Sequence, residues 1–217
     1  MAFWITNLAG WVLAYLLGSI PTAYLLGKLF RGIDIREHGS GSVGATNALR
    51  VLGRWPALAV LLVDILKGVA AIVLVRWLMT SLSVAPSGWS NSQTWCTWAV
   101  AGAGLAALVG PSRPVWLQFS GGKSVAVGLG VMLALAWPAA LGALAVFAVA
   151  IAVARIVSLG SILAASAAII LVLVLDYPFP HRLLIIAGGL YVIGRHHANI
   201  RRIVQRTEPR IGQASSS

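Results

Sequence analysis

Residues 124–175 read SVAVGLGVMLALAWPAALGALAVFAVAIAVARIVSLGSILAASAAIILVLVL, and Arg155 is the single charged side chain among them. A helix that crosses a membrane needs roughly 20 apolar residues, and fewer where it is short or shielded by other protein. The stretch therefore predicts three such helices, at 124–137, 139–155 and 158–175. The first two are joined so tightly that one re-entrant pair is the alternative.

The rest of the chain has the same character. Hydrophobic residues make up 59% of the 217 and charged residues 10%, with a mean hydropathy of +0.89, whereas a soluble domain carries roughly 25% charged residues. Four further spans are expected at 3–28, 55–79, 95–111 and 182–197. The first of them lacks a basic region ahead of it and is long for a signal peptide, so we expect it to be retained. The sequence predicts an all-α integral membrane protein of about seven spans, with residues 1–217 forming one domain.

The basic residues predict an orientation. With the N-terminus outside, thirteen of the 16 Lys and Arg residues fall in loops on the cytoplasmic side or in a cytoplasmic C-terminus, which is the usual bias of inner loops. The net charge of +11 is spread over short stretches between apolar runs, so it indicates topology and an anionic substrate or lipid rather than nucleic acid. The outer loop 81–94 has a turn composition, and residues 215–217 are expected to form a disordered tail.

Metal and cofactor chemistry has little support in the sequence. Cys96 is the only cysteine, so an internal disulfide is excluded, and no Cys/His spacing resembles a structural zinc site. Asp34 and Glu37 are the acids near the first glycine-rich loop, and nothing beside them completes a set of metal ligands. We therefore expect no metal and no cofactor.

Polar, glycine-rich segments interrupt the apolar sequence, and the first of them is Gly39-Ser40-Gly41-Ser42-Val43-Gly44-Ala45-Thr46-Asn47. A short helix is expected over 43–52, ended by Gly53, so Asn47, Arg50 and Arg54 would share one face. Loop amides that precede a helix N-terminus can hold an anion. The alternative is a flexible loop before a charged surface helix.

A second segment is Gly121-Gly122-Lys123, which directly precedes an apolar run. Gly122-Lys123-Ser124 matches the end of the nucleotide P-loop, but Leu117 stands where that motif begins with glycine, and no strand is expected before it. Phosphate binding by backbone amides and an ammonium group remains the functional interpretation. The alternative is a loop whose lysine only sets topology.

Three further groups carry polar side chains at or within the spans. Ser158 and Ser161 begin one span, where serine most often packs closely or bonds to a carbonyl. A continuous helix through 195–202 would place Arg195, His196, Asn199 and Arg202 on one polar face. Asp64 and Lys67 lie at i and i+3 within a span, where they form either a functional pair or a structural ion pair.

Taken in order, these motifs resemble the bacterial acyl-phosphate:glycerol-3-phosphate acyltransferase family (PlsY type). The matching residues are Gly18-Ser19-Ile20-Pro21, Gly39-Ser40-Gly41, Gly44-Ala45-Thr46-Asn47, Gly121-Gly122-Lys123, Ser158-Leu159-Gly160-Ser161, and His196 with Asn199. The resemblance covers nearly the whole chain. It implies a seven-helix enzyme of the bacterial inner membrane whose site faces the cytoplasm. The enzyme would transfer a fatty acyl group from acyl phosphate to sn-glycerol 3-phosphate, giving lysophosphatidic acid and phosphate.

The resemblance also implies roles for individual residues. The expected catalytic set is Ser40, Arg50, Lys123, His196 and Asn199. The expected substrate-binding set is Gly39, Gly41, Thr46, Asn47, Gly121, Gly122, Ser158 and Ser161. Arg50 and Lys123 suit the two phosphates, while Ser40, Asn47 and Asn199 suit glycerol hydroxyls. Between Ser158 and Ser161 the sequence does not choose.

The chain departs from the family at three positions. The family usually has Asn at Ser42, His at Pro111 and a further Gly at Ser124. These differences leave the fold unaffected and put one or two substrate contacts in question.

The expected chemistry needs no covalent intermediate, because acyl phosphate is already activated. The chain also contains no His-x-x-x-x-Asp pair, the general-base signature of thioester-dependent glycerolipid acyltransferases. Our hypothesis is that His196 positions a substrate while the donor phosphate takes the proton. The sequence does not indicate the oligomeric state, and we expect a monomer in membrane lipid. The alternatives are a transporter for a phosphorylated metabolite and a non-catalytic scaffold.

Overall fold

The computed structural model describes residues 2–82 and 92–212, so most of the expected outer loop 81–94 and the expected tail 215–217 lie outside the described residues. Every regular element within those ranges is helical. In chain order they are α1 (Ala2–Ser19), α2 (Thr22–Arg31), η1 (Ile35–Glu37), α3 (Ala45–Val51), α4 (Arg54–Ser81), α5 (Ser92–Ser112), η2 (Val115–Leu117), α6 (Val125–Leu135), α7 (Trp137–Ala154), α8 (Val157–Val174), α9 (Phe179–Arg195) and α10 (His197–Val204).

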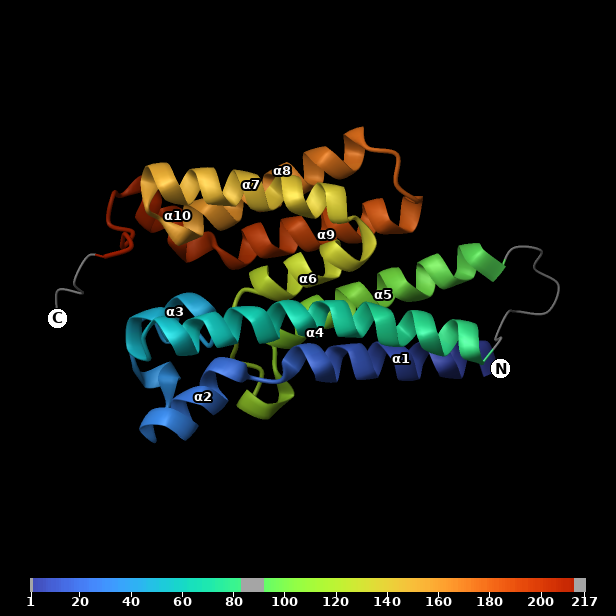
Figure 1. Ribbon diagram of the computed structural model, residues 1–217, viewed down its shortest axis with the longest axis horizontal. Coiled ribbons are helices and arrows are strands. Elements are labelled where there is room, and N and C mark those ends of the chain that lie inside the picture. Colours follow the sequence, from blue (N-terminus) through green and yellow to red (C-terminus); the bar gives the residue numbers. More distant parts are fainter. Residues whose placement is uncertain (1, 83–91, 213–217) are drawn as a thin grey trace.

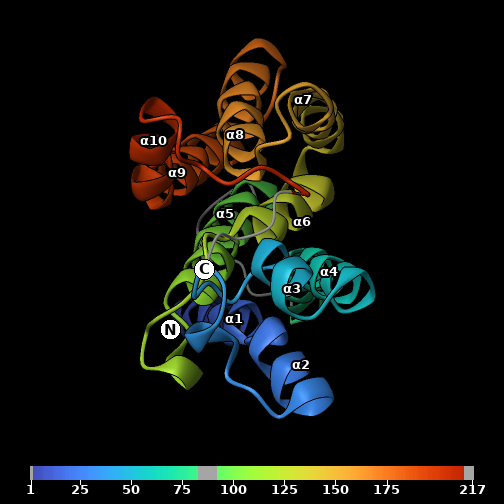
Figure 2. The same ribbon diagram turned by 90° about the vertical axis from the view of Figure 1, so that its left-hand side faces the viewer.

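The long helices lie side by side in two groups. α1, α4 and α5 pack together with α6 against α4, and α8 packs between α7 and α9. α5 contacts α9 and so joins the groups, as the end-on view in Figure 2 shows. Residues with small side chains allow close contact, as is usual where lipid gives helices no hydrophobic reason to associate. Gly18 of α1, for example, leaves no room for a Cβ beside the carbonyl of Ala107 in α5.

Hydropathy and length identify four described segments that can cross a membrane: Phe3–Arg31, Arg54–Ser81, Trp137–Ala154 and Val157–Val174. α6 is apolar but has only 11 residues, and it forms a hairpin with α7 through Ala136. The expected spans thus correspond to helices. Their number as membrane crossings and their orientation stay predictions.

Two expected helices are interrupted. The expected span 3–28 is wrong as a single helix, because it breaks between Ser19 and Thr22. Pro21 lacks a backbone N–H and forces the residue before it out of helical geometry, so the amide of Ile20 bonds to the Leu17 carbonyl and α2 starts in a new direction.

The expected polar face over 195–202 is also interrupted. α9 ends at Arg195, and the amide of His196 bonds to the carbonyl of Ile193, three residues back. The carbonyl of His196 then accepts from the amide of Ile200 and begins α10. His196 is therefore the junction of two helices rather than a position within one.

The polar segments share one end of the bundle. In Figure 1, α2, α3, α10 and the C-terminal segment lie at the left, whereas the N-terminus and the start of α5 lie at the right. One end of the helix bundle therefore carries the candidate site.

Candidate functional site

Asn47 organises the first glycine loop. Its side chain is 1% exposed, its amide group donates to the carbonyls of Ile35 (3.1 Å) and His38 (3.0 Å), and its Oδ1 accepts from the amide of Ser40 (2.9 Å). Gly39 has φ +61°, and a Cβ there would overlap Asn47 Oδ1. Both amide hydrogens of Asn47 are used within this part of the chain rather than offered beside Arg50, and a contact of Asn47 with substrate stays a prediction. The hydroxyl of Ser40 is left at the surface.

The second glycine loop is held against the end of α5. The amide of Gly122 donates to the carbonyl of Pro111 at 2.7 Å, and Gly121 lies so close to Pro111 and Pro114 that a side chain cannot fit. Ser124 has φ +62°, a conformation that favours glycine. Its hydroxyl bonds to the Leu108 carbonyl (2.5 Å) and to the Ser112 hydroxyl (2.6 Å). The glycine usual at this position in the family that the motifs resemble would suit this backbone conformation. The serine that stands here instead makes two hydrogen bonds through its hydroxyl.

The third part of the site is assembled around Glu208, whose side chain is 5% exposed. Its Oε1 accepts from the hydroxyl of Ser158 and from the amide of Asn199, both at 2.6 Å, and its Oε2 accepts from Arg202 Nε at 2.7 Å. The hydroxyl of Ser161 bonds within its own helix, to the Val157 carbonyl. Ser158 is therefore the serine connected to Asn199.

Sequence reasoning missed Glu208. Its signal was that it is the only acid in a C-terminal segment rich in arginine, between Arg206 and Arg210. An acid isolated among cations points to a specific ion pair, because it is the one local group that can compensate them.

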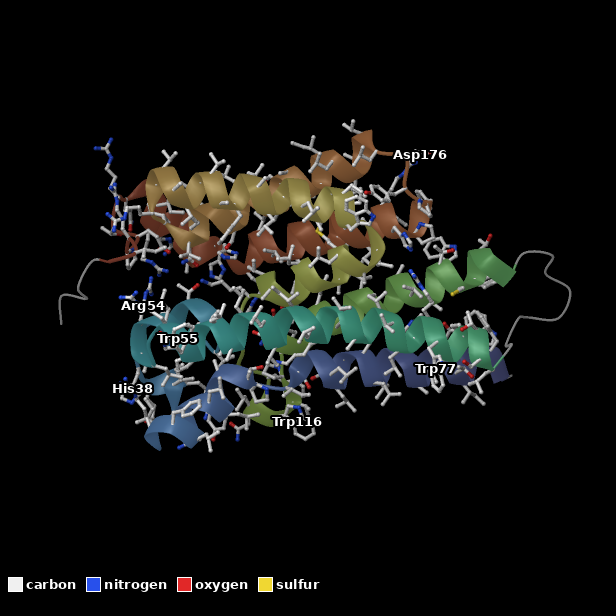
Figure 3. The ribbon with its side chains drawn as sticks, viewed as in Figure 1. His38, Arg54, Trp55, Trp77, Trp116 and Asp176 are labelled. Carbon is white, nitrogen blue, oxygen red and sulfur yellow. The ribbon has the colours of Figure 1, made fainter. Side chains whose placement is uncertain are left out.

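The three parts meet at one place. Arg195 at the end of α9 donates from Nη2 to the carbonyl of Gly122 at 3.0 Å, across 73 residues of sequence. A Cβ added to Gly122 would lie 3.9 Å from Ser42 Oγ and 4.0 Å from the Gly44 amide, so the two glycine loops are neighbours. Figure 3 shows His38 and Arg54 at this end, whereas Asp176 and Trp77 lie toward the other.

The electric field around Lys123 is dominated by cations. Burial lowers the pKa of the Lys123 ammonium below its ordinary value, and Glu208 opposes that effect. The guanidinium groups of Arg202, Arg50 and Arg195 lower the pKa further, so all three lie near Lys123. Glu208 is the one carboxylate that offsets these cations, so the surroundings of Lys123 carry a positive charge that suits a phosphate.

Glu208 stays ionised in this setting. Burial alone would raise the pKa of its carboxyl group, but hydrogen bonds from Ser158, Asn199 and Arg202 outweigh burial and hold the pKa below its ordinary value. Its charge therefore orients three donors from two helices, Ser158 of α8 and Asn199 and Arg202 of α10, at neutral pH.

His196 and Arg195 each keep a polar atom available. His196 is 2% exposed, and its Nδ1 lies 2.7 Å from the Val192 carbonyl, which assigns the proton of a neutral ring to Nδ1 and leaves Nε2 as an acceptor. Arg195 Nε is buried without a hydrogen-bond partner among the described residues. Both groups suit a bound polar ligand better than a purely structural role.

The remaining expectations are divided. The fold gathers the segments that carry Ser40, Arg50, Lys123, His196 and Asn199 at one end of the bundle. Thr46 is half-buried, and its side chain makes no hydrogen bond to the part of the chain that the structure describes. An open hollow of about 600 Å³ at the start of α4 is lined by Arg54, Trp55 and Leu58. Of these, the sequence had marked only Arg54, on the expected face with Asn47 and Arg50. No group of three metal-ligating side chains occurs in 2–82 or 92–212.

Comparison with known families gives one match over most of the chain. The family model described as glycerol-3-phosphate acyltransferase matches residues 8–206. A glycerol-3-phosphate acyltransferase 2 of Rhizobium johnstonii is 59% identical over 219 residues, covering 99% of this chain and 100% of the relative. A glycerol-3-phosphate acyltransferase of Acaryochloris marina is 51% identical over 217 residues, covering 98% of this chain and 96% of the relative.

Two crystal structures share the fold. PlsY, an integral membrane glycerol 3-phosphate acyltransferase, superimposes in its glycerol 3-phosphate form with a TM-score of 0.82 and 35% identity, covering 95% of this chain and 96% of that one. Its lysophosphatidic acid form gives a TM-score of 0.80 and 34% identity, covering 95% of each chain.

Proposed function

Because this chain belongs to the glycerol-3-phosphate acyltransferase family, we propose that it transfers a fatty acyl group from acyl phosphate to sn-glycerol 3-phosphate. The products would be lysophosphatidic acid and inorganic phosphate. The observation that carries the proposal is the hydrogen bond of Arg195 to Gly122 at 3.0 Å, which brings a guanidinium beside Lys123 in the second glycine loop; Arg50 and Arg202 add their charges by lowering the Lys123 pKa. Such a group of cations, with loop amides beside it, suits a reaction whose acceptor, donor and leaving group all carry phosphate.

The reaction can proceed without a protein nucleophile. The C1 hydroxyl oxygen of glycerol 3-phosphate attacks the acyl carbonyl carbon, the bond from that carbon to the phosphate oxygen breaks, and phosphate leaves with the electron pair. The departing phosphate can take the hydroxyl proton, which balances the step. Lys123 and the arginines stabilise the charge of the phosphates, and the two glycine loops hold donor and acceptor in reacting geometry.

His196 suits a positioning role in this scheme. With its proton on Nδ1 and bonded to Val192, its Nε2 can accept a hydrogen bond from the hydroxyl group that does not react, which leaves the proton of the attacking hydroxyl to the departing phosphate. Asn199 is held by Glu208, and its side-chain oxygen can accept from the same unreacting hydroxyl. Ser40 offers a hydroxyl at the edge of the first loop.

The hollow at the start of α4 suits the donor. Trp55 and Leu58 provide apolar walls that can contact a long acyl chain, and Arg54 provides a guanidinium that can bind the phosphate at its end. We place the site at the cytoplasmic face of the bacterial inner membrane, on the basis of the distribution of basic residues. A single chain of one domain supplies all the side chains that the scheme uses.

A transporter is not favoured. Transport would place unpaired polar groups along a path near the middle of the bilayer. Asp64 and Lys67, the ionisable residues at depth in α4, are bonded to each other at 2.7 Å and to the α1–α2 junction. A scaffold without catalysis leaves the clustered cations without a role.

The proposal is tested by the choice of donor. Purified protein in lipid is supplied with glycerol 3-phosphate and palmitoyl phosphate, and phosphate and lysophosphatidic acid are measured together. We expect the two products in equal amounts and no product with palmitoyl-CoA. Turnover with the thioester, or a folded protein that is inactive with palmitoyl phosphate, would contradict the proposed donor.

A pH profile follows from the charge of Lys123. Because the Lys123 pKa is lowered, its ammonium loses the proton as pH rises at a lower value than an exposed lysine, whose pKa is about 10.4. We expect kcat/KM for glycerol 3-phosphate to fall on the alkaline side with a midpoint below that value. In Lys123→Arg the guanidinium stays charged, so the same fall should move to higher pH. Coincident alkaline limbs in wild type and variant would contradict this role.

A further inference from the structure

Lys67 makes its contacts with the break between α1 and α2 rather than with solvent. The side chain is 6% exposed near the middle of α4, and Nζ donates to the Ile20 carbonyl at 2.5 Å, to Asp64 Oδ1 at 2.7 Å and to the Thr22 hydroxyl. The Thr22 hydroxyl in turn donates to Asp64 Oδ1 at 2.9 Å. All three ammonium hydrogens are therefore used, and two of the three acceptors belong to the break.

Lys67 adds a contact to the break from a neighbouring helix. The Ile20 carbonyl accepts from the Thr22 amide at 3.0 Å, within the break itself, and from Lys67 Nζ of α4 as a second donor. The direction in which α2 leaves α1 is consequently tied to α4.

A series of contacts leads from α2 to the first glycine loop. The amide of Ile33 donates to the Gly27 carbonyl at 3.3 Å, and Ile35, fully buried, lies beside Gly27. The Ile35 carbonyl accepts from Asn47, which also holds the Ser40 amide. A displacement of α2 would therefore be passed to Ser40.

The same part of α4 also lies against the helix that follows the second glycine loop. Gly68 packs so closely on α6 that a Cβ would overlap the Val127 carbonyl, and a Cβ on Gly130 would overlap the Ile65 carbonyl. α6 begins two residues after Lys123. Residues 64–68 thus contact the supports of both glycine loops.

We propose that Lys67 and Asp64 are positioning residues for the reaction, and that their ion pair sets the position of the first glycine loop relative to the second. This inference rests on the proposed function, in which the two loops hold the substrates together. A misplacement of about 1 Å between reacting groups can lower a rate about 100-fold. An ion pair that only stabilised the fold could be replaced by apolar side chains with little effect on the site.

The double variant Asp64→Leu/Lys67→Met distinguishes these two roles, because it leaves no unpaired charge in the helix bundle. We expect a folded protein with a melting temperature close to that of wild type and a kcat/KM for glycerol 3-phosphate lowered about 10- to 100-fold at saturating palmitoyl phosphate. Lys67→Arg, which keeps charge and donors, should recover part of the loss. Arg182→Met is the matched control, since it removes the ion pair to Asp176 at the other end of the bundle; we expect it to leave kcat/KM unchanged.

Wild-type kcat/KM in the folded double variant would overturn the proposal. Thr22→Val provides a second test without any change of charge, since it removes both hydrogen bonds of the Thr22 hydroxyl, to Lys67 and to Asp64; a folded Thr22→Val protein with unchanged kinetics would also overturn it. Binding of glycerol 3-phosphate measured by calorimetry needs no donor. We expect it to weaken about 10-fold in the variants, and unchanged binding would count against positioning even if the proposed donor were wrong.

Discussion

Replacing Lys123 with alanine is expected to lower kcat/KM for glycerol 3-phosphate about 1,000-fold, the upper range for loss of one donor aimed at developing charge. Lys123 follows Gly121, which leaves no room for a side chain, and Gly122, whose amide donates to the Pro111 carbonyl, so its backbone is held against Pro111. The Lys123 side chain is half-buried, so we expect that an exposed lysine or arginine cannot move in to supply the lost charge. Phosphate release from palmitoyl phosphate, followed in membranes or detergent, measures the loss.

The control is the same substitution at Lys28, which lies 5.9 Å from the Tyr24 ring on α2. Lys28→Ala should stay within about twofold of wild type, since surface cation–π contacts contribute about 0.5–1 kcal/mol. Lys123→Arg should fall between alanine and wild type, because it keeps the charge but changes its geometry. Substantial activity in a folded Lys123→Ala protein would remove the central cation from the mechanism.

Replacing Glu208 with glutamine is expected to lower both stability and activity. Glutamine has nearly the same shape, but its NH₂ group must face either Arg202 or the donors Ser158 and Asn199, so a donor meets a donor. Losing hydrogen bonds to a buried charge costs about 3 kcal/mol, which corresponds to a melting temperature lower by roughly 6–12 °C in a chain of this size. Release of Asn199 should also lower kcat/KM at least about 10-fold.

The pH dependence of that stability loss is a sharper test. The folded-state pKa of Glu208 is lowered, so its contribution is complete above the unfolded pKa and is lost as pH falls through the folded value. The difference in melting temperature between wild type and Glu208→Gln should therefore be full at neutral pH and shrink in acid. Glu37→Gln, the same change at an exposed position, should have no such effect. Equal melting temperatures of the Glu208 variant and wild type at pH 7 would contradict the arrangement around the carboxylate.

Hydropathy predicted the helices well because burial in lipid depends on the composition of a segment and little on its neighbours. The charge-poor run 124–175 accordingly contains α6, α7 and α8. Helix interruptions were missed because the hydropathy of a segment does not depend on which backbone hydrogen bonds it makes. Pro21 marks a possible break in the sequence, but the second donor to the Ile20 carbonyl, the Lys67 ammonium, lies 47 residues away.

The site was predicted in its residue types and only partly in its roles. Glycines beside Lys123 and an arginine-rich C-terminus signalled an anion. Asn47 carried the same signal as Asn199, yet one holds a loop and the other is held by Glu208. Residue type fixes what a side chain can donate or accept, and only its neighbours decide which bonds are already made.

By itself, the sequence determined that this is a membrane protein of the glycerol-3-phosphate acyltransferase family and that its polar motifs carry cations suited to phosphate. The tertiary structure decided that Arg195 meets Gly122 and that Glu208 gathers Ser158, Asn199 and Arg202. These contacts join segments up to 73 residues apart. They depend on how the close packing of the helices positions the loops at their ends relative to one another, and a local pattern of residues does not determine those positions.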